Sequence, residues 1–264
     1  MSASPARLAA LKVEIAALER RSRADGRVLT LAGPGLDSSL PGGGLPLGCW
    51  HEFAGEGLEL ETAAAGAAFV ARLAAPLAGR GEMIWVLRRD DLNAPGLANC
   101  GLPAERLIQV CARDEAEALA VLEDALRTRG VAAAIGEVEA VDLTAGRRLQ
   151  LACEETGATG FVLRRRPYGG GDRGRTGSAA ATRWVIAPAP SEPKPTSEGA
   201  LGLEPFGLGA PRWRAKLERC RGGRAGAWIL EAAEEVDDAA HPFRLVADLA
   251  DRDLATQALL RLAG

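Results

Sequence analysis

The segment that decides the fold spans residues 40–62 and reads LPGGGLPLGCWHEFAGEGLELET. Its proline followed by three glycines predicts a turn, because glycine adopts backbone conformations that other residues avoid and proline cannot continue a regular element. The apolar run at residues 49–54 predicts a buried strand, and the alanine-rich residues 62–79 predict a helix. The segment therefore predicts the first strand and helix of an α/β domain.

The same alternation of strands and helices continues outward from this segment. Strands are predicted at residues 28–31, 82–87, 107–110, 131–135, 159–163 and 183–187, with further helices at residues 114–130 and 144–156. A capping box formed by Asp114 and Glu117 is predicted to begin the first of these two helices. Strands separated by helices form βαβ units, so we predict an α/β fold with a mostly parallel central sheet flanked by helices.

Residues 26–187 are thus the predicted core, and three segments are added to it. Residues 1–25 predict an amphipathic helix, whose apolar side chains Leu8, Leu11, Ile15 and Leu18 recur at spacings of three and four. This helix either packs on its own domain or docks on a partner or second copy. Residues 188–211, rich in Pro, Ser and Glu, predict a linker or surface loop. Residues 212–264 predict a C-terminal hairpin with its turn at 221–224, an edge strand at 243–246 and a final helix at 254–262.

The charge of the chain is nearly balanced, with 32 basic and 35 acidic residues and a formal net charge of -3. Contact with nucleic acid therefore requires a local cluster of basic residues. Residues 164–175 form such a cluster, in which glycines separate the candidate DNA-binding residues Arg164, Arg165, Arg166, Tyr168, Arg173 and Arg175. The segment is either a solvated loop or a loop whose arginines meet phosphates while Tyr168 stacks on a base, and the two interpretations are compatible.

A second basic cluster lies on the first strand of the predicted hairpin. Its basic residues alternate with apolar ones, which is typical of a strand with one wet face. The candidate partner-binding residues are Arg212, Trp213, Arg214, Lys216 and Arg219, and Arg221 and Arg224 continue the basic face. This face is either solvated surface or a patch for nucleic acid or an acidic partner. Core packing is the preferred interpretation of Trp213.

The cysteines and histidines favour a reducing, cytoplasmic setting without a metal site. The five cysteines are far apart with no CxxC pair, and the only histidines are His51 and His241. There is no apolar leader with a cleavage site, and no run approaches the roughly 18 uninterrupted apolar residues of a membrane span. Neither histidine lies in a nucleophile motif, and His51 is predicted to lie in a buried strand, so no catalytic residue and no cofactor are expected.

Residues 40–62 resemble the entrance to the nucleotide-binding domain of the RecA family, where a GGGLP-type turn leads into a strand, a phosphate loop and a helix. The resemblance covers about residues 28–187, and the order of the elements is its stronger part. It implies a RecA-like core and places the ends of the phosphate loop at Gly55 and Thr62.

This resemblance also implies that the phosphate loop is degenerate, because it places Leu60 at the final glycine and Glu61 at the lysine. A working loop needs glycines that turn N–H groups toward the phosphates and a lysine that neutralises their charge. Reversing a unit charge at about 4 Å costs several kcal/mol at an effective dielectric of about 20. A carboxylate at position 61 therefore opposes phosphate binding.

Further functional positions of the RecA family are altered as well. The resemblance places Arg89 near the glutamate that acts on the attacking water, and arginines after strand 159–163 where the family has a nucleotide-sensing glutamine. It places Glu137 near the magnesium-associated aspartate, a role that a glutamate can fill. ATP hydrolysis is therefore not expected, and the alternative is a residual ATPase that uses a displaced cation.

Among RecA-like proteins without a working phosphate loop, the chain resembles the ImuA family. The resemblance is carried by the N-terminal helix, LPGGGLP, the HEF strand and the APRWR segment at residues 210–214. It implies a non-catalytic adaptor in damage-induced (SOS) translesion synthesis that binds an ImuB-type polymerase-like protein and, indirectly, an inducible DnaE-type polymerase. RecA and DNA stay open as further partners. The alternative is an inhibitor similar to the SulA family that acts on a tubulin-homologue polymer; the N-terminal helix and the basic tail argue against it.

Overall fold

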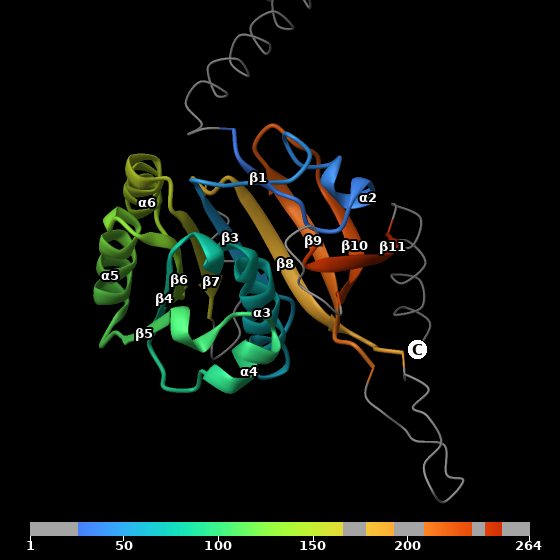
Figure 1. The fold of residues 1–264 in the computed structure, drawn as a ribbon, viewed down its shortest axis with the longest axis horizontal. Helices are drawn as coiled ribbons and strands as arrows, with labels where there is room; N and C mark the ends of the chain where they lie inside the picture. The colour runs from blue at the N-terminus through green and yellow to red at the C-terminus, as the bar shows by residue number, and fades with distance from the viewer. Residues whose placement is uncertain (1–25, 166–177, 193–208, 234–240, 250–264) are drawn as a thin grey trace, which may run out of the picture.

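The computed structural model describes residues 26–165, 178–192, 209–233 and 241–249. Its centre is a nine-stranded sheet with the strand order β11-β10-β9-β8-β3-β7-β6-β4-β5 (Figure 1). The parallel part comprises β3 (Trp50–Gly55), β4 (Glu82–Leu87), β5 (Leu107–Cys111), β6 (Val131–Val138), β7 (Thr159–Arg164) and β8 (Thr182–Ala189). The antiparallel part comprises β9 (Arg212–Cys220), β10 (Gly226–Ala232) and β11 (Phe243–Asp248). The predicted α/β fold with a mostly parallel sheet and a C-terminal hairpin is confirmed.

Helices cover both faces of the parallel strands. Their bounds are α2 (Pro34–Asp37), α3 (Glu59–Ala74), α4 (Ala94–Asn99), α5 (Glu115–Arg127) and α6 (Leu143–Thr156), with 3-10 turns at Ala75–Arg80 and Ala104–Arg106. A separate two-stranded sheet pairs β1 (Val28–Leu29) with β2 (Leu45–Pro46). Figure 1 shows α3 beside β3 and β8, with α5 and α6 packed together at the other side of the sheet.

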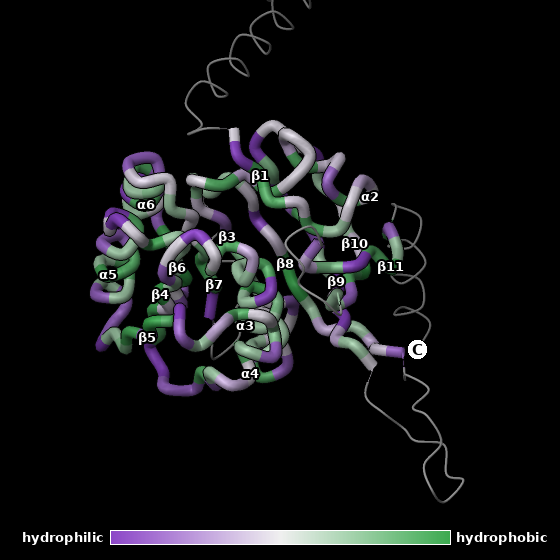
Figure 2. Tube along the Cα trace, viewed as in Figure 1, coloured by the Kyte–Doolittle hydropathy of each residue, from purple (hydrophilic) through white to green (hydrophobic). Residues whose placement is uncertain are grey.

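Alternation along the strands creates one hydrophobic core on each face of the sheet. Adjacent residues of a strand point to opposite faces, so Trp85 belongs to the core under α3 and Val86 to the core under α5 and α6. Hydrophobic stretches follow the strands and the helices that cover them, and hydrophilic residues concentrate in the outer turns (Figure 2). The sheet is thus buried on both faces where it is parallel, as βαβ units require.

The C-terminal hairpin shares the core under α3. Trp213 of β9 is buried, its indole Nε1 donates a hydrogen bond to the Ala65 carbonyl oxygen at 2.9 Å, and its ring packs edge-on against Phe69 at 5.8 Å. Phe243 of β11 stacks on Phe69 with a centroid distance of 4.6 Å. Large aromatic side chains contribute much of the stability of a core. Strands β9 to β11 are therefore held to α3 by side chains as well as by the sheet.

Several predicted bounds differ from the structure. Helix α3 begins at Glu59 and not at residue 62, and its predicted last turn is the 3-10 segment Ala75–Arg80, which contains Pro76 near its start. Strand β6 continues through Gly136 to Val138, beyond the predicted residue 135. The short elements α2, β2 and α4 were not predicted, because segments of two to six residues show too little periodicity. The predicted helix at 254–262 lies outside the described residues.

The predicted capping box at α5 is half present. The Asp114 carboxylate accepts a hydrogen bond from the Glu117 backbone N–H at 2.8 Å, as expected for a residue preceding the helix. The Glu117 carboxylate accepts from the N–H and guanidinium of Arg113, and not from Asp114. The reciprocal bond fails because the arginine offers Glu117 a charged donor as well as a backbone N–H.

One run in the described residues has the length and hydropathy of a membrane span. It is Glu59–Arg80, with 22 residues and a mean hydropathy of 1.3. Since 67% of this window is buried inside the domain, the run is the apolar core helix of the fold.

Candidate functional site

The connection from β3 to α3 is the segment where the resemblance to the RecA family predicts a phosphate loop. An ideal Cβ atom on Gly55 would lie 2.2 Å from the Thr62 hydroxyl oxygen, so only glycine fits and the two ends of the loop touch. The Thr62 side chain is buried, and its hydroxyl donates to the Leu58 carbonyl oxygen at 3.1 Å. The structure therefore brings together the predicted ends of the loop, with the Thr62 hydroxyl engaged inside the first turn of α3.

Leu60 and Glu61 lie on that first turn with different orientations. The Leu60 residue is 96% exposed, an unusual position for a leucine. Gly57 has a φ of 92°, and a Cβ atom there would lie 3.5 Å from Oε2 of Glu61. The Glu61 carboxylate thus lies against the loop, where its charge opposes a bound phosphate.

Arg165, the residue after β7, occupies the centre of the site. Its Nε lies 3.0 Å from Oε1 of Glu59, its Nη2 lies 2.5 Å from Oδ2 of Asp91, and its Nη1 lies 3.4 Å from Oε2 of Glu137. Only 14% of the Arg165 side chain is exposed. These residues come from α3, the loop after β4 and strand β6, which meet because the carboxyl ends of parallel strands share one edge of a sheet. One guanidinium thus pairs with three carboxylates.

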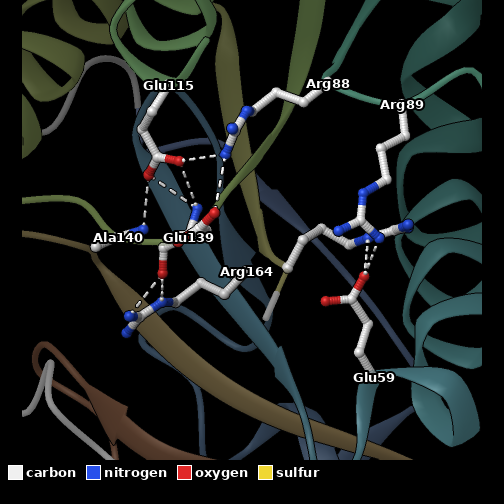
Figure 3. A network of polar contacts seen from close by, with 8 residues as sticks. Glu59, Arg88, Arg89, Glu115, Glu139, Ala140 and Arg164 are labelled. Carbon is white, nitrogen blue, oxygen red and sulfur yellow. Dashed lines mark hydrogen bonds and ion pairs between the residues drawn. The ribbon is translucent and has the colours of Figure 1, made fainter. Parts of the chain in front are cut away.

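The remaining predicted residues of the site belong to the same network. Arg89 shares a carboxylate oxygen of Glu59 with Arg165, with its Nη1 3.3 Å from Oε1 (Figure 3). Glu137 is 3% exposed, and its Oε1 accepts a hydrogen bond from the Trp85 indole N–H at 2.9 Å. Because Arg165 takes its other oxygen, both oxygens of Glu137 have partners inside the protein.

Burial and neighbouring charges have opposite effects on the pKa values of Glu137 and Arg165. Burial raises the pKa of the Glu137 carboxyl, while the charge of Arg165 and the hydrogen bond from Trp85 offset part of this rise. Burial alone would lower the pKa of Arg165, but the carboxylates of Glu137, Asp91 and Glu59 outweigh it and raise that pKa. The guanidinium therefore stays charged in a partly buried site.

A second network extends along the same edge of the sheet. Arg88 lies 3.0 Å from a carboxylate oxygen of Glu115 and 3.0 Å from one of Glu139 (Figure 3). The guanidinium of Arg164 donates to the Glu139 carbonyl oxygen and pairs with Glu52 at 3.0 Å. Sequence analysis did not identify the partners Glu52, Glu59, Arg88, Asp91, Glu115 and Glu139. The available signal was that most of them lie at or near the carboxyl ends of predicted parallel strands.

Little open space remains in the site. A cavity of about 80 Å³ lies between Arg89, Glu137 and Arg165, and one of about 60 Å³ lies under the loop beside Gly55. Binding pockets for small molecules and cofactors typically measure about 300–1,000 Å³. A larger cavity of about 280 Å³ borders the network, and it is lined by Leu60, Ala64 and Leu92 as well as by Glu59, Arg89, Asp91 and Arg165. The part of the site that would hold phosphates is thus filled by the protein's own side chains.

The candidate DNA-binding residues fall into two groups. Arg164 is 8% exposed in its side chain and paired with Glu52, and Arg165 is held by its three carboxylates. Both guanidiniums are thus engaged inside the domain. The remaining candidates lie outside the described residues, and they are Arg166, Tyr168, Arg173 and Arg175.

The candidate partner-binding residues of β9 include some that are engaged within the domain and some that line an open groove. Arg212 pairs with Glu231 at 2.6 Å, and Arg214 pairs with Glu56. Trp213 lies in the core, in agreement with its preferred interpretation. Lys216 and Arg219 line an open groove of about 820 Å³, together with Arg183, Glu218, Arg224 and Asp248. The N-terminal candidates Leu8, Leu11, Ile15 and Leu18 lie outside the described residues.

His51 belongs to a buried chain of hydrogen bonds and not to a reaction site. Its Nε2 lies 2.8 Å from the Pro46 carbonyl oxygen, so Nε2 carries the proton and Nδ1 accepts from the Thr182 hydroxyl at 2.7 Å. The Trp184 indole N–H in turn donates to Thr182 at 2.8 Å. Burial lowers the pKa of His51 to about 4, so the ring is neutral at pH 7. All five cysteines are free, and the described residues contain no group of three His, Cys, Asp or Glu side chains that could hold a metal ion.

Comparisons with known proteins place the chain in a family. No family model matches it. The proteins named ImuA from two strains of Caulobacter vibrioides, NA1000 / CB15N and ATCC 19089 / CIP 103742 / CB 15, are each 58% identical to it over 244 residues, which is 90% of this chain and 96% of theirs. The crystal structure of SulA from Pseudomonas aeruginosa is similar over 44% of this chain and 96% of its own, at 22% identity and a TM-score of 0.38, a likeness too weak to carry an argument. With this identity over nearly the whole chain, the protein belongs to the ImuA family.

Proposed function

We propose that this chain is a non-catalytic, RecA-like accessory protein of damage-induced mutagenic translesion DNA synthesis in the cytoplasm, and that its direct partner is an ImuB-type polymerase-like protein. Membership of the ImuA family supports the biological setting. The observation that carries the absence of catalysis is the Arg165 guanidinium, paired with Glu59, Asp91 and Glu137 at the edge of the sheet.

A nucleotide would have to displace this network in order to bind. A phosphate at the loop would meet the carboxylates of Glu59 and Glu61, and each like-charge contact at about 4 Å costs about 4 kcal/mol at an effective dielectric of 20. Removing Arg165 from its place would leave Glu137 buried without a counter-charge. Breaking a buried ion pair in this way costs about 3–5 kcal/mol. Both costs oppose a nucleotide-bound state.

The partner-binding function is proposed for surfaces away from this site. The groove beside the hairpin is lined by Arg183, Lys216, Arg219 and Arg224, against the acidic Glu218 and Asp248. An excess of basic side chains favours an acidic partner surface and raises the rate of association. The N-terminal residues Leu8, Leu11, Ile15 and Leu18 are proposed as a second contact. RecA is a further proposed partner.

DNA contact is proposed for the arginine-rich segment that follows Arg165. The anchored guanidinium of Arg165 fixes the point where this segment leaves the sheet. Arginines bind phosphates without regard to sequence, and each such contact makes binding weaker at higher salt. DNA affinity that does not depend on salt would contradict this part of the proposal.

Co-purification with an ImuB-type protein from the same genome tests the partner. Deleting the hairpin is unsuitable, because β9 to β11 share the core with α3. We therefore choose the surface substitutions Lys216→Glu and Arg224→Glu, which are expected to weaken capture at least tenfold while the melting temperature changes little. Arg129→Glu, at an exposed position in another part of the domain, is the matched control. Failure of the unmodified full chain to bind the partner would refute the adaptor role.

ATP turnover by the purified chain tests the absence of catalysis. The expected rate equals that of buffer with magnesium and ATP. Turnover above this background that disappears in the Glu137→Ala variant would establish the residual-ATPase alternative and overturn the proposal.

A further inference from the structure

Strand β5 forms an open edge of the nine-stranded sheet. It comes after β4 in the strand order, and the described residues place no further strand beyond it (Figure 1). The opposite edge is partly covered, because the Phe243 backbone N–H of β11 donates to the Leu31 carbonyl oxygen at 3.1 Å and α2 packs against β11. Proteins usually protect an edge with charged residues, proline, a bulge or a covering segment. Strand β5 (LIQVC) has no charged residue, no proline and no register shift against β4.

The backbone of β5 offers unpaired groups to a further strand. The N–H of Ala112, directly after β5, donates to the Leu87 carbonyl oxygen of β4 at 2.8 Å. In a parallel pair, alternate residues direct both of their backbone groups to the same neighbour, so Ile108 and Val110 face β4 as Ala112 does. The residues whose N–H and C=O groups point away from the sheet are therefore Leu107, Gln109 and Cys111.

Apolar side chains accompany these free backbone groups. Helix α5 packs over β6 and β4, and Ile108, one strand further out, is 48% exposed. Val110 lies on the same face of the strand and is half-buried, and Leu107 is half-buried on the other face. A further strand would remove these side chains from water and satisfy the outward backbone groups, and both effects favour association.

The sequence of β5 is complementary to a second copy of itself in antiparallel orientation. The outward residues are spaced evenly about Gln109, so a two-fold axis at Gln109 pairs Gln109 with its own copy and Leu107 with Cys111, and every outward N–H obtains an acceptor. Ile108 then lies opposite Val110 of the second copy in a pair without backbone hydrogen bonds, where side chains are closest and β-branched residues stabilise a sheet.

Charge at the ends of the strand agrees with this orientation. Glu105 before the strand is exposed, and Arg113 after it has a side chain that is 86% exposed, although it also pairs with Glu117. Antiparallel pairing about Gln109 brings Glu105 of each copy toward Arg113 of the other. The ends of the two strands therefore attract each other.

We propose that two copies of this chain associate through β5, which joins their sheets into one continuous sheet about a two-fold axis at Gln109. Such an interface uses the same surface on both copies and therefore closes at a dimer. The groove beside the hairpin is lined by residues of β8 to β11, far from β5 in the strand order, so the dimer leaves both grooves open. The inference does not depend on the proposed function.

Sedimentation equilibrium of the full chain in reducing buffer tests this proposal, because the mass of a dimer depends on protein concentration, here varied from about 1 to 200 μM. The expected result is the mass of one chain at the lowest concentration and of two chains at the highest. The mass of a single chain throughout this range, or a mass above two chains, would overturn the inference.

Variants of Gln109 locate the interface. Gln109→Pro removes an outward N–H that β4 does not use, and Gln109→Lys places two like charges opposite each other at the two-fold axis. Each is expected to weaken association at least tenfold, and Gln109→Lys keeps the test valid if the proline variant fails to fold. Leu151→Lys is the matched control, because Leu151 is 52% exposed on α6, and it is expected to leave association unchanged. Unchanged association of a folded Gln109→Lys chain would contradict the proposal.

Disulfide trapping tests the register of the two strands. One chain carries Ile108→Cys and another carries Val110→Cys, both with Cys111→Ser, and copper phenanthroline is the oxidant. The mixture of the two chains is expected to give at least fivefold more cross-linked dimer than either chain alone, because positions 108 and 110 face each other only between copies. Equal cross-linking in the three samples would exclude the register centred on Gln109.

Discussion

Nη1 of Arg165 lies 3.4 Å from Oε2 of Glu137, and this pair joins the carboxyl ends of β7 and β6 at the edge of the sheet where the resemblance to the RecA family predicts a nucleotide site. The same guanidinium reaches Glu59 on α3 and Asp91 after β4. A positive charge at this place is thus supplied by the protein itself. It ties together four segments that are far apart in the sequence.

Replacing Arg165 is expected to destabilise the domain strongly. In Arg165→Met the side chain keeps much of its length, but Glu59 and Glu137 lose their shared counter-charge. We expect a loss of about 3–5 kcal/mol in the free energy of unfolding, measured by urea denaturation at pH 7. The exposed pair Arg106–Glu82 provides the control, and Arg106→Met is expected to cost less than about 1 kcal/mol. Equal effects of the two substitutions would show that the network is not structural.

Restoring the phosphate-loop residues alone is expected to fail to create a nucleotide site. Leu60→Gly with Glu61→Lys supplies a glycine and a lysine at the positions of the motif, but Arg165 and its carboxylates still fill the space behind them. We expect a Kd for magnesium-ATP weaker than about 1 mM by isothermal titration calorimetry. Micromolar binding by this double variant would show that the network does not exclude nucleotide.

Stability is expected to fall between pH 6.5 and pH 4 because of His51. Its folded-state pKa is lowered to about 4 from the ordinary 6.5, so the unfolded chain binds a proton in this range that the folded chain does not. The free energy of unfolding therefore decreases as the pH falls, and the loss reaches about 3 kcal/mol at pH 4.

The contribution of His51 is isolated by comparison with His51→Gln, since carboxyl groups also titrate in this range. Urea denaturation at pH 7.0, 5.5 and 4.5 should show a steeper loss for the unmodified chain than for the variant, whose neutral side chain does not titrate. Parallel pH dependences of the two chains would contradict the assignment of a neutral, buried His51.

Gly55→Ala is expected to destabilise the domain by about 1–3 kcal/mol, because the new methyl group would lie 2.2 Å from the Thr62 hydroxyl oxygen. Adding Thr62→Ala should recover part of this loss, since it removes the hydroxyl oxygen, whereas the Cβ atom of residue 62 stays 2.8 Å from the new methyl group. Gly79→Ala is the control, because a Cβ atom there meets no atom within 4 Å. The coupling is measured by thermal or urea denaturation of the unmodified chain, Gly55→Ala, Thr62→Ala and the double variant. Strictly additive effects of the two substitutions would contradict the predicted clash.

Most of the α/β alternation could be predicted because each element carries its own local signal. The strand Glu82–Leu87 was predicted with the bounds that the structure shows, because a glycine before it and an arginine after it indicate where the strand begins and ends. The hairpin was also predicted, because Trp213, Ala215 and Leu217 alternate with charged residues. Elements such as α2 and α4 were missed because a helix of one turn shows no repeat of its own.

Of the candidate site, sequence reasoning identified the altered positions but not what fills the space. The resemblance to a RecA-type domain indicated that Glu61 and Arg89 replace functional residues of that family, and that Glu137 can fill the role of its magnesium-associated aspartate. It could not show that Arg165, 106 residues from its partner Glu59, enters the same site. Ion pairs between residues so far apart depend on how the strands are ordered in the sheet, and no local pattern in the sequence indicates the strand order.

What the sequence by itself determined is most of the longer strands and helices, the identity of Leu60 and Glu61 at the start of α3, and the basic character of the segments after β7 and on β9. These depend on side-chain periodicity and on residue identity at a few positions, which are local properties of a chain. Only the tertiary structure decided which charges neutralise one another and which stay free. Arg164, Arg165 and Arg212 are engaged by distant carboxylates, whereas Leu60 and one oxygen of Glu59 are left without a partner among the described residues. Charge pairing requires contact in space, and that contact arises only when the carboxyl ends of the strands meet at one edge of the sheet.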